Sequence, residues 1–376
     1  MFELVKFNPW LVGCNFLMWL VSYMVVYPAL REPYNELSYY RQKTAFCLLI
    51  IFTICAFWGS DWFHIYDKYH ILVLNNWRLE SVYHWIAANL APNSYFLWRF
   101  IVWGLASILV WSTFNHLALN KSLAIALFLT IWMLWFSYAR VSLSMALVFW
   151  GFALLHCKSF RSPYFLIGFI AILSAFYFHK SASFAIICCL IALISPLMNR
   201  KVWYLLLIFF PVVIYFARQY LSGIFLSDVK IESNEIASYI ARGQDYLNLV
   251  NKFQGVGYLV GQLLERIPYY MLAMTSFRII VSDEIDEHPK DIVAFMKLLV
   301  LITFFASLFM FDLSMNTQLV YERFMRFSFI PACIVLTYCL ANGIFPKWHS
   351  YVLHIAISGT VYQLIYMFYC SIMYKP

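Results

Sequence analysis

The chain has 376 residues, of which 64% are hydrophobic and only 12% are charged, and its formal net charge is +8. Soluble domains carry roughly a quarter of charged residues, so a water-soluble core cannot absorb this much apolar surface. The basic excess indicates contact with anionic lipid headgroups. Because no tract rich in Lys and Arg is interleaved with polar sequence, nucleic acid is not an expected partner.

Apolar runs recur along the whole chain, and a helix needs about 20 such residues to cross a bilayer. The runs are apolar at consecutive positions, as in Leu123–Leu129 and Phe184–Ile194, which differs from the alternating pattern of a transmembrane β-barrel. We therefore expect an all-α fold, a polytopic transmembrane helix bundle that forms a single domain over residues 1–376. About twelve spans are predicted, near residues 10–30, 43–58, 96–116, 121–138, 141–156, 164–178, 181–198, 202–217, 262–281, 292–312, 324–342 and 350–372.

Basic residues in short connections predict which side of the membrane each connection occupies. The first connection carries Arg31, Arg41 and Lys43 and is assigned to the cytoplasm. Alternation then places on the same side the connections at Lys121, Lys158–Arg161, Arg200–Lys201, Ser282–Asp291 and Lys347. The external side receives both termini and the connections at 59–95, Arg140, His179–Lys180, 218–262 and Asn316–Arg323. The two long external loops, 59–95 and 218–262, are long enough to contain short helices.

The first external loop carries Asp61 among aromatic residues, close to His64. A carboxylate at a membrane surface is partly desolvated, which suits a general base. Alternatively, Asp61 caps the helix that follows it. His64 and His70, combined with nearby carboxylates, do not have the spacing of a compact metal site, so neither a metal nor another cofactor is expected.

Two positively charged positions interrupt apolar runs further along. Arg140 lies between two such runs, and a guanidinium at bilayer depth needs a partner, for which an anionic ligand serves as well as a carboxylate. The alternative for Arg140 is extension of its side chain to the interface. His179, followed by Lys180 and two serines at a predicted helix start, can act as an acid, a base or a phosphate ligand. The alternative for His179 is a structural interfacial histidine.

Arg323 and Arg326 are three residues apart and are therefore expected on one face of a helix that enters the membrane from outside. Such a pair can bind a phosphate or pyrophosphate, unless Glu322 neutralises Arg326 at i,i+4. The long loop 218–262 mixes amides, charges and tyrosines, which is the composition of a carbohydrate-binding surface or of an ordinary amphipathic surface helix. Its candidate substrate contacts are Tyr239, Arg242 and Tyr246.

Several of these segments together resemble the EpsG family, which is related to the Wzy polymerases of O-antigen, capsule and exopolysaccharide. The segments are Gly59-Ser60-Asp61 followed by Tyr66, Arg140 with Leu143 and Ala146, Phe178-His179-Lys180-Ser181-Ala182, and Arg323 followed by Pro331. The resemblance extends in patches over most of the chain, and its most specific part is 138–182.

The resemblance implies a multi-span glycosyltransferase similar to the GT-C type, in the inner membrane of a bacterium. Such an enzyme transfers a growing glycan from an undecaprenyl-pyrophosphate carrier to the non-reducing end of another lipid-linked repeat unit, at the external face of the membrane. The implied partners are the lipid-linked donor and acceptor, membrane lipids and a regulator of chain length. The external face agrees with the orientation predicted from charge.

The chemistry of this reaction suggests roles for the candidate residues. Departure of a lipid pyrophosphate concentrates negative charge that the protein must stabilise, for which we select Arg140, Arg323 and Arg326, assisted by Lys180. His179 or Asp61 would be the base for the acceptor hydroxyl, and direct attack without a metal would invert the anomeric centre. Further substrate contacts are assigned to Tyr66 and His64 and to the three residues of the long loop.

Two other functions remain open at this point. A flippase or transporter for lipid-linked oligosaccharides also needs cationic groups for pyrophosphate, but its polar groups should line a path through the full membrane depth. A membrane acyltransferase could use His179, although no second catalytic element with a familiar spacing accompanies that residue.

Overall fold

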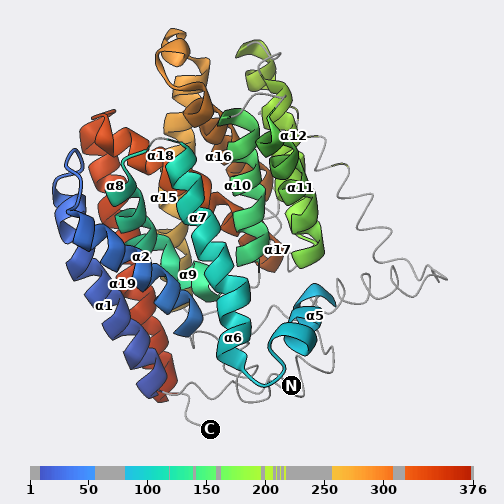
Figure 1. Ribbon diagram of the computed structural model, residues 1–376. Coiled ribbons are helices and arrows are strands. Elements are labelled where there is room, and N and C mark those ends of the chain that lie inside the picture. Colours follow the sequence, from blue (N-terminus) through green and yellow to red (C-terminus); the bar gives the residue numbers. More distant parts are fainter. Residues whose placement is uncertain are drawn as a thin grey trace.

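The computed structural model describes residues 9–55, 81–117, 119–138, 141–157, 162–195, 200–205, 256–307 and 318–373, together with positions 209, 212 and 216. All regular elements in these ranges are helical, as the apolar runs predict. The helices lie side by side in a bundle, and most run roughly along its long axis (Figure 1). The all-helical fold predicted from the sequence is therefore confirmed.

The helices of the first half interrupt their α-geometry twice with five-residue π-helical segments. A π-helical segment adds one residue to a turn and often occurs at functional sites. The elements are α1 (Pro9–Arg31), α2 (Tyr39–Cys55), α5 (Ser81–Leu90), α6 (Tyr95–Arg99), the π-helix η1 (Phe100–Gly104), α7 (Leu105–His116), α8 (Lys121–Leu127), the π-helix η2 (Phe128–Trp132), α9 (Met133–Tyr138) and α10 (Ser142–Cys157).

The remaining described elements include two long helices, α15 and α19, and several shorter ones. They are α11 (Pro163–Phe178), α12 (Ala182–Ile194), α15 (Val256–Val281), the 3-10 helix η5 (Asp283–Glu287), α16 (Lys290–Ser307), α17 (Gln318–Met325), the 3-10 helix η6 (Arg326–Ser328), α18 (Phe329–Ala341) and α19 (Pro346–Met373). Most predicted spans coincide with one of these helices within a few residues, although α15 begins earlier than its predicted start at residue 262. The predicted span 202–217 lies largely outside the described residues.

Length and composition qualify three of the described helical stretches to cross a membrane, namely Gly13–Arg31, Tyr95–His116 and Arg323–Ala341. Four shorter apolar helices span Lys121–Ser137, Ser142–His156, Pro163–Phe178 and Ala182–Ile194. A 16-residue helix is about 24 Å long, whereas a bilayer core measures about 30 Å. The membrane-protein prediction is thus supported, and the count of about twelve spans stays a prediction.

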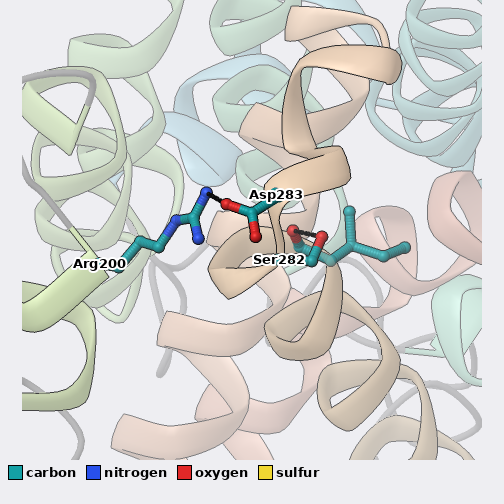
Figure 2. A network of polar contacts seen from close by, with 4 residues as sticks. Arg200, Ser282 and Asp283 are labelled. Carbon is teal, nitrogen blue, oxygen red and sulfur yellow. Dashed lines mark hydrogen bonds and ion pairs between the residues drawn. The ribbon is translucent and has the colours of Figure 1, made fainter.

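Several connections that the charge pattern assigns to one side lie, in their described residues, at one end of the bundle (Figure 1). The amide of Asn120 donates to the Pro33 carbonyl at 2.9 Å, which joins the α7–α8 connection to the α1–α2 turn. Arg200 forms an ion pair with Asp283 at 2.5 Å, and Ser282 closes the end of α15 beside it (Figure 2). We call this end, with η5 at the top of Figure 1, the η5 end.

The opposite end contains α5, the start of α6 and the α11–α12 junction (Figure 1). Here the ring of Tyr83 on α5 lies 6.0 Å from that of Phe178, the last residue of α11. We call this the α5 end. It gathers connections that the charge pattern assigns to the external side.

The helices α10 and α11 pack closely against each other, and α11 ends at the α5 end. A Cβ added at Gly151 of α10 would lie 2.5 Å from the backbone oxygen of Gly168 on α11, so these helices touch through their backbones. Small residues permit this approach in membranes, where association depends on van der Waals packing. The contact fixes α11, and with it the position of the α11–α12 junction.

Candidate functional site

Four of the predicted site residues lie in the described part of the chain: His179, Lys180, Arg323 and Arg326. The others, which are Asp61, His64, Tyr66, Arg140, Tyr239, Arg242 and Tyr246, lie outside the described residues. The helices that precede two of them in sequence are described: α2 before Asp61 and α9 before Arg140.

His179 terminates α11 and is held by its own neighbours. Its backbone is extended (φ −160°, ψ 124°), and its N–H donates to the carbonyl of Ala175 at 3.1 Å. The Ser181 backbone N–H donates to His179 Nδ1 at 3.2 Å, and the Ser181 Oγ lies 2.5 Å from the same nitrogen. Because a backbone N–H can only donate, Nδ1 is the acceptor and the proton of the neutral ring resides on Nε2.

The turn after His179 starts α12. The N–H of Ala182 donates to the His179 carbonyl at 2.9 Å, and Ser183 donates to the Lys180 carbonyl through both its N–H and its hydroxyl. The Lys180 side chain is exposed, and His179 is half-buried. A cationic side chain and an imidazole N–H are therefore presented at the first turn of a helix, where backbone amides favour anions.

An aromatic stack brings the α11–α12 junction beside the two predicted arginines. The ring of Phe184, in the first turn of α12, lies parallel to that of Phe324 on α17, with 4.1 Å between centroids and 9° between planes. Phe324 lies between Arg323 and Arg326 in sequence, and both arginines are half-buried. Segments separated by more than a hundred residues thus meet through one ring pair.

The spacing predicts that the two arginines share one α-helix, but in the structure they lie in two consecutive elements. Arg323 lies in the last turn of α17, which ends at Met325, and Arg326 begins the 3-10 turn η6. The i,i+3 relation survives because residues three apart also lie above one another in a 3-10 turn. The Glu322 side chain lies outside the described part, so its predicted pairing with Arg326 is not tested.

Sequence reasoning missed a polar cluster next to Arg323. The Tyr270 hydroxyl lies 2.8 Å from Ser307 Oγ and 3.2 Å from the Tyr321 hydroxyl. The Arg266 guanidinium lies over the Tyr321 ring at 4.3 Å from its centroid. This cluster joins α15 and the end of α16 to α17. In sequence, Arg266 is embedded in a mostly apolar run, and no local pattern associates it with residue 321.

A small cavity opens near this cluster, between α9, α15 and α19. Two indole rings, a carboxylate and an amide are among the groups that line it, contributed by Trp132, Trp135, Glu265 and Gln363. The Trp132 N–H donates to the Tyr269 hydroxyl at 3.0 Å, which fixes one wall. At about 20 Å³, the cavity has room for a water molecule and is too small for a sugar ring.

A hydrogen bond joins the two helices that precede and follow Arg140 in sequence. The Ser142 hydroxyl, at the start of α10, donates to the Phe136 carbonyl in the last turn of α9. Ser142 is fully buried. The end of α9 and the start of α10, which are the described segments nearest to Arg140 in sequence, are therefore joined directly.

Comparison with known proteins gives the family of the chain. No curated protein and no solved structure matches the chain. A family model with the description EpsG family matches residues 40–375, nearly the whole chain. The match includes the α11–α12 junction, the two arginines and the positions of Asp61 and Arg140. The chain therefore belongs to the EpsG family.

Proposed function

We propose that this protein is a polysaccharide polymerase of the membrane glycosyltransferase class. EpsG-type proteins are Wzy-like polymerases. The reaction proposed is transfer of a glycan from undecaprenyl-pyrophosphate to the non-reducing end of a second lipid-linked repeat unit, with no metal and with inversion at the anomeric carbon. The proposed fold is a GT-C-type bundle of about twelve spans.

One observation carries this proposal: the Phe184–Phe324 stack, with 4.1 Å between ring centroids. It brings His179 and Lys180 to the same end of the bundle as Arg323 and Arg326. Breaking a glycosidic bond to pyrophosphate places growing negative charge on the phosphate oxygens, and preorganised cationic donors stabilise that charge most in the transition state. A cluster of this kind suits the donor leaving group, and Arg140 is proposed as a further member.

The hydrogen bonds of His179 suggest how its ring contributes. With Nδ1 accepting from Ser181, the neutral ring offers Nε2–H, so His179 is suited to donate a hydrogen bond to a phosphate oxygen. We assign the base to Asp61, which would remove the proton of the acceptor hydroxyl as its oxygen attacks the anomeric carbon. The bond from that carbon to the pyrophosphate breaks in the same displacement.

The proposed sugar contacts come from the loops. Tyr66 and His64 would contact the sugar nearest Asp61, and Tyr239, Arg242 and Tyr246 would contact the rest of a repeat unit. The proposed location is the bacterial inner membrane with the α5 end facing the exterior. The charge pattern supports this orientation, since the basic connections gather at the η5 end. A separate chain-length regulator is a proposed partner.

A reconstituted assay tests the proposal. Purified protein would be incubated with a lipid-linked repeat unit, and the products would be separated by size while released lipid pyrophosphate is measured. We expect a ladder of products and one lipid pyrophosphate for each bond formed. Movement of the intact lipid-linked unit across a vesicle membrane, without a ladder of products, would show that the protein is a flippase and would overturn the polymerase assignment. Transfer of an acyl group instead would indicate the acyltransferase.

A further inference from the structure

Arg99 is a fully buried cation that none of the proposed chemical steps uses. It ends α6 and precedes the π-helix η1, and its relative exposure is 0%. A buried guanidinium is expensive to place at membrane depth, and such residues usually support function. Its contacts therefore need an explanation beyond solubility or surface charge.

The Arg99 guanidinium joins the ends of two other helices. Its Nη2 donates to the carbonyl of Thr53 and, at 2.8 Å, to the carbonyl of Ser137. Thr53 lies in the last turn of α2, which ends at Cys55, and Ser137 lies in the last turn of α9, which ends at Tyr138. Carbonyls in a last turn lack partners within their own helix, and a cation there complements the helix dipole.

The same side chain also reaches the α11–α12 junction through stacked rings. The guanidinium lies over the Trp103 ring at 4.4 Å from its centroid. Trp103 stacks on Tyr83 with 5.8 Å between centroids, and Tyr83 contacts Phe178 at 6.0 Å. Phe178 immediately precedes His179. One buried cation is thus linked to the end of α2, the end of α9 and the α11–α12 junction.

In sequence, the proposed catalytic groups lie within a few residues of these three places. Asp61 follows α2 by six residues, and Arg140 follows α9 by two residues. We infer that Arg99 is a positioning residue: it joins the ends of α2 and α9 and, through Trp103 and Tyr83, sets them relative to His179. The inference rests on the proposed function for its catalytic meaning, whereas the coupling of the two helix ends stands independently of it.

Arg99→Met is the informative variant. Methionine has a similar length and is apolar, so it suits a buried site in a membrane protein, but it cannot donate to either carbonyl. Misplacement of about 1 Å can reduce turnover about 100-fold, so we expect kcat to fall by about that factor. KM for the lipid-linked acceptor should change less than about threefold, because the substrate contacts themselves remain. Arg99→Lys, which keeps the charge and some donors, should recover part of the loss.

Hydrogen exchange of the intact protein gives a second measurement that needs no substrate. In Arg99→Met, the backbone amides just after Thr53 and just after Ser137 should exchange faster, while those of α16 should not. Ser107→Ala is the matched control. Its hydroxyl lies 2.7 Å from Thr53 Oγ1, so the change removes a buried contact to α2 and leaves the two carbonyl contacts of Arg99 in place.

The results separate this inference from the proposed function. Unchanged exchange at both helix ends in Arg99→Met, or an equal response in Ser107→Ala, would overturn the positioning role. A KM increase with unchanged kcat would also overturn it, since that result indicates direct substrate binding. If the wild-type protein forms no polymer, the proposed function fails, and the exchange measurement still decides whether Arg99 couples the two ends.

Discussion

At the scale of single residues, the role of His179 can be tested with two substitutions, because the side-chain amides of glutamine and asparagine mimic different nitrogens of the imidazole ring. Glutamine places its NH2 near the position of Nε2, whereas asparagine reaches only to that of Nδ1. If Nε2–H binds the leaving pyrophosphate, His179→Gln should keep turnover within about tenfold of wild type. His179→Asn should lose about 100-fold or more. Equal, complete losses in both variants, measured by product ladders at matched protein amounts, would favour a base role.

The two arginines call for a comparison of charge with geometry. Arg323→Ala and Arg326→Ala should each reduce kcat about 100-fold, because in the proposed reaction each removes a donor that stabilises the developing phosphate charge. Lysine at either position should restore only part of the lost kcat, since an ammonium cannot reproduce the planar, forked hydrogen-bonding geometry of a guanidinium. Arg200→Ala is the control. Arg200 pairs with Asp283 at the η5 end, so its loss should leave turnover unchanged. A similar loss in all three alanine variants would argue against a site at the α5 end.

At the scale of elements, the contact between α12 and α17 depends on the Phe184–Phe324 stack. Phe184→Ala should lower turnover because it lets Arg323 and Arg326 move away from the α11–α12 junction. Phe184→Tyr, which keeps a stackable ring, should behave like wild type. A double-mutant cycle with Phe324→Ala should give a coupling of about 0.5–1.5 kcal/mol. Ile187→Ala, at an exposed position of the same helix, should change little.

The α10–α11 contact gives a prediction about stability. A Cβ at Gly151 would lie 2.5 Å from a backbone oxygen that cannot move without its helix, so Gly151→Ala should destabilise the protein by about 1–3 kcal/mol. Gly13→Ala on α1 is the control, because a Cβ there meets nothing within 4 Å. Thermal unfolding in detergent measures both. A lower Tm for Gly13→Ala than for Gly151→Ala would contradict the packing argument.

At the scale of the whole molecule, the two ends of the bundle should be accessible from opposite sides of the membrane. In a background without native cysteines, Ser183→Cys at the α5 end and Asp286→Cys in η5 should react with an impermeant thiol reagent from different sides. Intact cells should label the first, and inverted vesicles the second. Labelling of both positions from one side would contradict the orientation predicted from the basic connections.

Residues with strong local signals were identified as candidates from the sequence. His179, Lys180, Arg323 and Arg326 each interrupt or border an apolar run, and burying a charge in lipid is costly enough to make such positions conspicuous. Arg266 and Arg99 also interrupt apolar runs, but their partners lie on other helices and are not visible in the sequence. Arg266 meets Tyr321 only when α15 packs against α17, and Arg99 meets the carbonyls of Thr53 and Ser137 only in the folded bundle.

The sequence by itself determined the helical class and most boundaries of the described helices. These properties follow from the composition and from the number of consecutive apolar residues, which act locally along the chain. Only the tertiary structure decided that Phe184 contacts Phe324 and that Arg99 joins the ends of α2 and α9. It also decided the tautomer of neutral His179, because the Ser181 N–H donates to Nδ1 and the ring proton is therefore on Nε2. Such contacts depend on helix rotation and crossing, which side-chain packing sets between segments far apart in sequence.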